Sequence, residues 1–189
     1  MEDQSREGIN IEKLLQCFRL LIPENSKTLA RIKHFYELDL NQIKQTTGVE
    51  LKGLILDVDG CLSPNHQDLL PENIAHLKKL ADAGIKILLY SNMIWTNRYE
   101  NLDPRIEVLT NLPPKPNLKG FEIAVSKLNL PKQNVAMLGD SYMTDAGAIR
   151  AGLHFIHVVP IPTPNGQNKI HDLFRNFFIR LSKFYDRFN

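Results

Sequence analysis

The fold is decided by one stretch of the chain, GLILDVDGCL at residues 53–62. Its apolar run predicts a buried parallel strand at 53–58, and Gly60 permits a tight turn directly afterwards. Side chains alternate along a strand, but the chain turns at the strand's carboxyl end, so Asp57 and Asp59 can converge on one site. Such paired carboxylates suit a hard cation such as Mg²⁺, and one of them could act as a nucleophile. Taken alone, the stretch also fits an ordinary strand end with a solvated Asp-Gly turn.

Composition indicates one globular domain of ordinary polarity. The chain has 189 residues, of which 43% are hydrophobic and 23% charged, with a net charge of +2. That charge is too small to indicate a nucleic-acid partner, and we expect none. Cys17 and Cys61 show neither zinc-ligand spacing nor a disulfide framework, so we expect reduced thiols and a cytoplasmic location. No apolar run reaches the roughly 18–20 residues that span a bilayer.

Apolar periodicity predicts strands that alternate with helices along most of the chain. Helices are predicted at 11–22, 71–84, 118–129, 143–151 and 168–187, and strands at 53–58, 85–90, 106–109, 134–138 and 155–159. This alternation is typical of an α/β protein with a Rossmann-like, doubly wound parallel sheet in three α/β/α layers. We expect a single domain over 1–189, with a helical extension at 1–50, a catalytic core at 51–160 and an amphipathic helix at 167–189.

Polar residues follow several of the predicted strands, where open α/β sheets bind their ligands. They are Asp57 and Asp59, Ser91 and Asn92, Lys115, and Asp140 with Asp145. Acids, a hydroxyl and a lysine at one sheet edge are suited to phosphoryl transfer, in which positioning and electrostatics provide most of the catalysis. The sequence therefore predicts a phosphoryl-transfer site at this edge.

The predicted chemistry needs a cation, because a carboxylate that approaches a phosphate monoester is repelled by its charge. Asp57 is the predicted nucleophile and would form an aspartyl-phosphate. Asp59 would protonate the leaving oxygen and then deprotonate the hydrolytic water. Asp140 would bind Mg²⁺ together with Asp57 and the backbone carbonyl of Asp59.

The remaining polar residues have predicted supporting roles. Ser91 and Asn92 are predicted to bind phosphate oxygens. Lys115 would balance charge on both the phosphoryl group and Asp57, and Asp145 would orient Lys115 or a metal-bound water.

In order and in kind, these residues resemble the four motifs of the haloacid dehalogenase superfamily of aspartate-nucleophile phosphatases. The matching motifs are Asp57-Val-Asp59, Ser91, Lys115, and Gly139-Asp140 with Asp145. The resemblance implies a Mg²⁺-dependent phosphatase. Between Asp59 and Ser91 there is room for only one helix and one strand, so we expect a capless enzyme with an open site.

A narrower resemblance covers about residues 20–185 and points to the YqeG-type, subclass IIIA members. It is carried by FYELDL at 35–40, GLILDVD at 53–59, GDSYMTD at 139–145, RAG at 150–152 and VVP at 158–160. This group includes phosphatases that convert phosphatidylglycerophosphate to phosphatidylglycerol. The chain departs from it at Gly60-Cys61, where Asn-Thr is common, and thereby lacks a hydroxyl near the phosphate site.

The C-terminal segment has an apolar stripe and a net basic face. The stripe comprises Ile170, Leu173, Phe174, Phe177, Phe178, Leu181, Phe184, Tyr185 and Phe188. A basic, phenylalanine-rich amphipathic helix suits an anionic bilayer surface, but such a stripe can equally pack on the sheet. For the helix at 11–22 the same choice exists, and packing is expected.

Three functions follow from these observations. The leading prediction is a Mg²⁺-dependent phosphatase of phosphatidylglycerophosphate, a lipid headgroup substrate, located peripherally on the cytoplasmic face of the membrane. The alternative is a soluble phosphatase of a sugar phosphate or a nucleotide. The non-enzymatic alternative is an inactive protein that binds a membrane or a partner.

Overall fold

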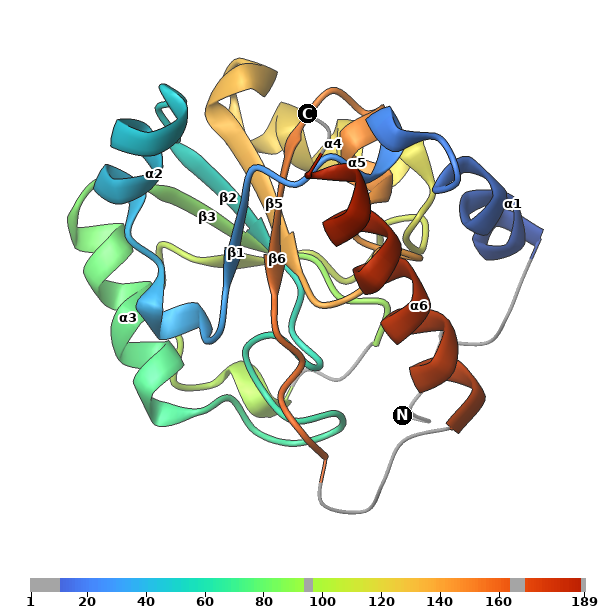
Figure 1. Ribbon diagram of the computed structural model, residues 1–189. Helices are drawn as coiled ribbons and strands as arrows, with labels where there is room; N and C mark the ends of the chain where they lie inside the picture. The colour runs from blue at the N-terminus through green and yellow to red at the C-terminus, as the bar shows by residue number, and fades with distance from the viewer. Residues whose placement is uncertain (1–10, 94–96, 164–168, 188–189) are drawn as a thin grey trace.

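A six-stranded sheet forms the centre of the protein, in a computed structural model that describes residues 11–93, 97–163 and 169–187. All neighbouring strands are parallel, in the order β1-β6-β5-β2-β3-β4 (Figure 1). The strands are β1 (Ala30–Ile32), β2 (Gly53–Leu56), β3 (Lys86–Leu89), β4 (Glu107–Val108), β5 (Val135–Gly139) and β6 (His154–Val158).

Helices cover both faces of the sheet. They are α1 (Ile11–Arg19), α2 (Leu40–Thr47), α3 (Pro71–Asp82), α4 (Leu118–Leu128), α5 (Gly147–Arg150) and α6 (Lys169–Tyr185). In Figure 1, α2 and α3 lie on one side of the sheet, whereas α1, α4, α5 and α6 lie on the other. The predicted three-layer α/β/α architecture is therefore confirmed.

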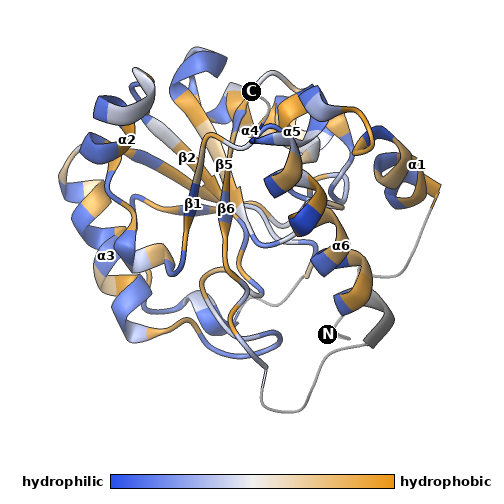
Figure 2. Cartoon of the chain, viewed as in Figure 1, coloured by the Kyte–Doolittle hydropathy of each residue, from blue (hydrophilic) through white to orange (hydrophobic). Residues whose placement is uncertain are grey.

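Burial on both faces explains why β2 is apolar at consecutive positions. Leu54 and Leu56 belong to the core cluster that also contains Leu77 of α3. Ile55 belongs to the opposite cluster, with Phe121 of α4. Alternate side chains thus enter different cores, as expected for a parallel strand between two helical layers. The central strands are accordingly coloured as hydrophobic in Figure 2.

The N-terminal segment differs from the predicted helical extension. Its described part contains β1, which pairs with β6 at the sheet edge, with Ala30 opposite Ile156. The three residues of β1 are only half-buried. So short an edge strand has no clear alternation of polar and apolar residues.

Helices α1 and α5 are shorter than the sequence predicts. Helix α1 ends at Arg19 rather than near residue 22, and α5 covers only Gly147–Arg150. Backbone hydrogen bonds from Asp145 to Ser141 and from Ala148 to Asp145 show that the chain turns repeatedly before α5 begins. These turns bring the segment after β5 back over the sheet edge.

The strand order places two acidic positions at the centre of the sheet. Strand β2 lies between β3 and β5, and the direction of chain progression reverses between β2 and β5. Such a switch point leaves a crevice at the carboxyl ends of the two strands. Asp57 follows β2 there, and Asp140 follows β5.

Helix α6 is fastened by one buried ring and a polar network. Phe178 is 4% exposed and packs in the core with Leu20. One turn further on, the buried Ser182 hydroxyl lies 3.0 Å from the Tyr142 hydroxyl and accepts a hydrogen bond from Arg31 at 2.7 Å. Arg31 also forms an ion pair with Asp186 at 2.5 Å. The inward face of α6 is therefore bound to the sheet layer.

Neighbouring phenylalanines on α6 provide a matched stability test. Phe178→Ala should lower the free energy of unfolding by about 3 kcal/mol, because it empties a buried site. Phe177 is 51% exposed, so Phe177→Ala should change it by less than about 0.5 kcal/mol. Urea denaturation of the two variants measures the difference, and equal losses would contradict this packing of α6.

Candidate active site

Three acids meet at the switch point between β2 and β5. Asp57, Asp140 and Asp145 each present a carboxylate oxygen, and these oxygens lie within 4.8 Å of one another. All three residues are buried. Like charges this close need a compensating cation, because their repulsion is poorly screened away from water.

Lys115 provides that charge from the loop before α4. Its ammonium nitrogen lies 2.8 Å from Asp57 Oδ1 and 2.6 Å from Asp145 Oδ1, and its side chain is 1% exposed. Burial opposes the ammonium charge, but Asp145 and Asp57 outweigh burial and hold the pKa of Lys115 above its ordinary value. Lys115 is therefore a permanent buried cation, placed next to Asp57 as the sequence predicts.

Asn92 fixes the backbone at Lys115. Its side-chain oxygen accepts a hydrogen bond from Lys115 N at 2.7 Å, and its Nδ2 donates to Lys115 O at 3.0 Å. The loop after β3 thus fixes the position of the loop that carries Lys115. This gives Asn92 a positioning role, and its predicted contact with phosphate stays a prediction.

Asp145 is held in place by a close approach of the backbone. Its Oδ2 accepts a hydrogen bond from Ser141 N at 3.1 Å, while its Oδ1 contacts Lys115. A Cβ atom at Gly139 would lie 2.1 Å from Asp145 Oδ2. Only glycine fits there, so Gly139 is what lets the Asp145 carboxylate reach Lys115.

Asp57 has one carboxylate oxygen held and the other open. Oδ1 accepts a hydrogen bond from Val58 N at 2.8 Å and contacts Lys115. Among the described residues, Oδ2 makes no hydrogen bond. The Asp57 side chain is 12% exposed, whereas that of Asp145 is 0% exposed. Asp57 is therefore the acid of this pair that an incoming ligand can reach.

Burial also perturbs the protonation of the acids. Burial, followed by the charge of Asp145, raises the pKa of Asp57 to about 7 against the pull of Lys115. Burial and the charge of Asp57 raise the pKa of Asp140 to about 7. A further cation at this site would favour the ionised form of both carboxylates.

Asp59 is paired with an arginine that the sequence analysis did not single out. Arg98 donates to Asp59 from Nη2 at 2.7 Å and from Nη1 at 2.8 Å, and its side chain is 0% exposed. Burial would raise the pKa of Asp59, but the Arg98 guanidinium outweighs burial and lowers it. Ser91 also donates to Asp59 Oδ2, at 3.3 Å.

Arg98 carries no signal that the sequence alone could reveal. It lies 39 residues after Asp59, in the short 3₁₀ helix η3 (Asn97–Tyr99). A second unforeseen arginine comes from α6, where Arg175 Nη1 lies 3.1 Å from Asp140 Oδ2. The C-terminal helix therefore contacts the site directly, which neither its periodicity nor its charge indicates.

The acid cluster fits a divalent cation. Carboxylate oxygens are the ligands that Mg²⁺ and similar hard ions prefer, and Asp57 and Asp140 follow the ends of two neighbouring strands. Gly60 has a φ of +79°, and a Cβ there would lie 2.8 Å from Asp140 Oδ2, so this glycine keeps space free beside the acid. The side chain of Asp59 is engaged with Arg98, and its predicted backbone contribution stays a prediction.

Comparison with known families defines the class of protein. The haloacid dehalogenase-like hydrolase family matches residues 11–152, which is most of the chain. This protein belongs to that family and is a hydrolase.

The similar proteins include some that are named as phosphatases. The chain is 27% identical over 145 residues to "Probable phosphatase YqeG" of Bacillus subtilis, covering 71% of this chain and 78% of the relative. Among solved structures, an uncharacterized protein from Listeria monocytogenes is 18% identical, with a TM-score of 0.45 over 70% of this chain and 99% of that one. The cobalt-bound deoxy-D-mannose-octulosonate 8-phosphate phosphatase of Haemophilus influenzae is 16% identical, with a TM-score of 0.44 over 71% and 90% of the two chains.

The raised pKa values predict a pH dependence of stability in metal-free protein. Between about pH 4 and pH 7, folded Asp140 keeps a proton that the unfolded chain has released, so its contribution to stability falls as pH rises. Asp140→Asn stays neutral and should gain stability relative to wild type across this window. The gain should reach a few kcal/mol at most, since one pKa unit corresponds to about 1.4 kcal/mol.

Thermal unfolding with EDTA or with MgCl₂ measures both effects. Mg²⁺ should raise the Tm of the wild type more at pH 7.5 than at pH 5, and should do little for Asp140→Asn. Asp68→Asn, a change at an exposed acid, is the control and should behave as wild type. If Mg²⁺ raised the Tm of Asp140→Asn as much as that of the wild type, Asp140 would not be a ligand of the metal.

Proposed function

We propose that this hydrolase is a Mg²⁺-dependent phosphatase that cleaves a phosphate monoester through an aspartyl-phosphate on Asp57. The observation that carries the proposal is the open Oδ2 of Asp57, at the switch point of the sheet and beside the buried cation Lys115. Asp59 lies two residues further on, at the same edge. Nucleophile, charge balance and proton donor are then provided by one crevice.

In the first half of the proposed reaction, Asp57 Oδ2 attacks phosphorus. A bond forms between that oxygen and phosphorus, and the bond from phosphorus to the leaving oxygen breaks. Asp59 gives its proton to the leaving oxygen. The phosphoryl charge that arrives beside Asp59 opposes the effect of Arg98 on its pKa and favours the protonated form.

In the second half, water attacks phosphorus and the bond to Asp57 breaks. Asp59, now ionised and again stabilised by Arg98, accepts the proton of the water. Lys115 stays 2.8 Å from Asp57 Oδ1 and balances the charge released on that carboxylate. Ser91 lies at the same edge, and its hydroxyl is proposed to bind a phosphate oxygen.

Asp57 and Asp140 are proposed to hold Mg²⁺, with Asp145 as support behind Lys115. Bound there, the ion would neutralise negative charge on the phosphoryl group and the carboxylates.

The proposed substrate is phosphatidylglycerophosphate, and the proposed location is the cytoplasmic face of a membrane, to which the protein would bind peripherally. The substrate is supported by the YqeG-type resemblance and by the similarity to the Bacillus subtilis relative over 71% of the chain. Between Asp59 and Ser91 the chain forms only α3 and β3, so no inserted domain lies over the site from this segment. Soluble sugar phosphates and nucleotides are the alternative substrates.

Loss of the nucleophile tests the chemistry. Asp57→Asn should lower kcat by a factor on the order of 10⁴ or more, as expected when a covalent nucleophile is removed. Asp68→Asn makes the same chemical change at an exposed acid in the neighbouring loop and should retain wild-type turnover. Circular dichroism should show that both variants are folded. Near-normal activity in folded Asp57→Asn would exclude the proposed mechanism.

A substrate panel with and without Mg²⁺ tests the specificity. Phosphatidylglycerophosphate in detergent micelles, sugar phosphates and nucleoside monophosphates should be compared by kcat/KM. We expect the lipid to be cleaved best, and cleavage to stop with EDTA. If a soluble monoester were cleaved best, the proposed phosphatase activity would stand and the proposed lipid substrate would be wrong. No release of phosphate from any substrate would favour an inactive binding protein.

A further inference from the structure

Helices α1 and α6 expose apolar side chains on one side of the protein. We call this surface the α1–α6 face; its members are Ile11, Leu14, Leu15, Phe18, Leu21, Ile22, Leu173, Phe174, Phe177 and Phe184. Each is between 45% and 76% exposed. A contiguous apolar patch of this size usually marks an interaction site. The side chains of Ile170 and Phe188, which the sequence places in the same stripe, lie outside the described residues.

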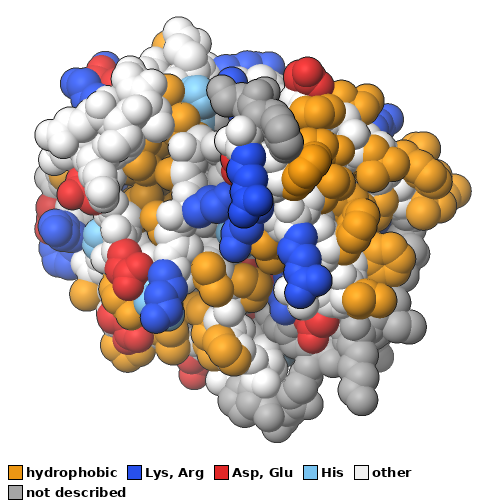
Figure 3. All heavy atoms as spheres, in the orientation of Figure 1, with side chains coloured by type: hydrophobic (Ala, Val, Ile, Leu, Met, Phe, Trp, Pro, Cys, Tyr) orange, Lys and Arg blue, Asp and Glu red, His pale blue; other side chains and the backbone are white. Residues whose placement is uncertain are grey.

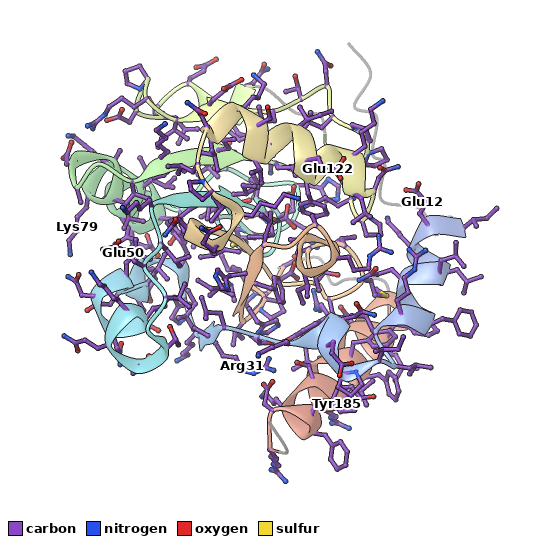
Figure 4. All side chains as sticks on the ribbon, turned by 90° about the horizontal axis from the view of Figure 1, so that it is seen from above. Glu12, Arg31, Glu50, Lys79, Glu122 and Tyr185 are labelled. Carbon is purple, nitrogen blue, oxygen red and sulfur yellow. The ribbon has the colours of Figure 1, made fainter. Side chains whose placement is uncertain are left out.

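The two helices contribute to one continuous surface. Tyr185 of α6 donates a hydrogen bond to the carbonyl of Leu21 at 2.8 Å, just after α1. Figure 4 shows α1 and α6 side by side, with Tyr185 between them and Lys79 on the far side of the protein. In Figure 3 the orange side chains cover this same flank.

The orientation of α1 is the reverse of the expected one. Its apolar residues recur at helical spacing and were expected to pack, yet they point outward, whereas Lys13 and Gln16 are buried. Among the described residues, neither polar atom of the Gln16 amide has a hydrogen-bond partner. Packing on the domain therefore does not use the apolar face of α1, and this expectation was wrong.

Basic side chains flank the α1–α6 face along α6. The described acids of α6 and of the residue that follows it are already paired, Asp172 with Arg175 and Asp186 with Arg31. Arg180, Lys183 and Arg187 are exposed and form no ion pair within residues 11–93, 97–163 and 169–187. The α1–α6 face therefore combines exposed phenylalanine rings with neighbouring basic side chains that form no ion pair among the described residues.

We propose that the α1–α6 face docks on an anionic lipid bilayer. Leucine and phenylalanine side chains would enter the headgroup boundary, while the basic residues would contact acidic headgroups. Charge favours this occupant over a second copy of the chain, because a symmetric interface would bring the same basic residues together. Within the described residues, no helix is long and apolar enough to cross a membrane, so the contact would be a surface contact.

This surface deepens the proposed function, on which its biological use rests, because it adjoins the site. Arg175 belongs to α6 and contacts Asp140, so the inner side of the docking helix contacts the acid cluster itself. A helix with its side chains is about 10 Å across. The acid cluster would thus lie about one helix diameter from the bilayer surface.

Co-sedimentation with vesicles tests the docking without using the phosphatase reaction. Vesicles of phosphatidylcholine mixed with phosphatidylglycerol should bind the full chain, more weakly at high potassium chloride, and vesicles of phosphatidylcholine alone should bind much less. Phe18→Ser and Phe177→Ser should each weaken the partition coefficient by about tenfold. Tyr36→Ser, an exposed aromatic on another surface, should not change it.

Two double variants that remove the same amount of charge separate electrostatic attraction at α6 from a nonspecific effect of net charge. Arg180→Gln with Lys183→Gln should weaken binding to anionic vesicles by about tenfold or more. Lys79→Gln with Lys132→Gln removes the same charge from exposed positions elsewhere and should have no effect. Thermal unfolding should show that all variants, which change exposed residues, remain folded.

Two outcomes would overturn the docking proposal. One is a failure of the docking test itself: either the wild-type protein does not bind anionic vesicles, or the target and control variants lose binding to the same extent. The other is a dimer in analytical ultracentrifugation that Phe18→Ser dissociates while vesicles stay unbound, since a second copy would then cover the face. The vesicles contain no phosphate monoester, so failed hydrolysis would leave a positive docking result intact, and failed docking would leave hydrolysis of soluble monoesters intact.

Discussion

The site depends on the burial of one positive charge among three negative ones. Lys115 contacts Asp57 and Asp145 at hydrogen-bond distance and is almost fully buried. Without it, Asp57 and Asp145 would repel each other in a medium that screens poorly. With it, the cluster still has two carboxylates in excess of Lys115, and burial raises the pKa of Asp57 and of Asp140 to about 7. That excess of negative charge would favour the binding of a cation, as the proposed mechanism requires.

Neighbouring residues hold Lys115 and Asp145 in position. Asn92 bonds to the backbone at Lys115, and Gly139 leaves the space into which Asp145 turns. Two buried arginines contact the other two acids of the crevice, Asp59 and Asp140. Arg98 keeps the pKa of Asp59 low, whereas Arg175 contacts Asp140 from a helix more than thirty residues further along the chain. At Asp59 the Arg98 guanidinium outweighs burial and lowers the pKa, whereas at Asp140 burial and the charge of Asp57 outweigh Arg175 and raise it.

Much of this arrangement could be predicted from the sequence, because it depends on local patterns. The apolar run of β2 indicates a strand buried on both faces, and the parallel topology then brings Asp57, Lys115 and Asp140 to one edge. Arg98 and Arg175 could not be predicted, since their contacts depend on how distant segments fold back. The outward apolar face of α1 could not be predicted either, because periodicity identifies an amphipathic helix but not which side meets the protein. Strand β1 is too short to give a periodic signal.

The pairing of β1 with β6 has a consequence for how the chain can assemble during synthesis. Ala30 lies opposite Ile156, so among the described residues the first strand of the chain pairs with the last one. For more than one hundred residues of translation, the strand with which β1 pairs has not yet been made. Contacts so distant in sequence slow folding, because a long loop must close before they form. The native pairing of β1 can therefore form only after β6 has been synthesised.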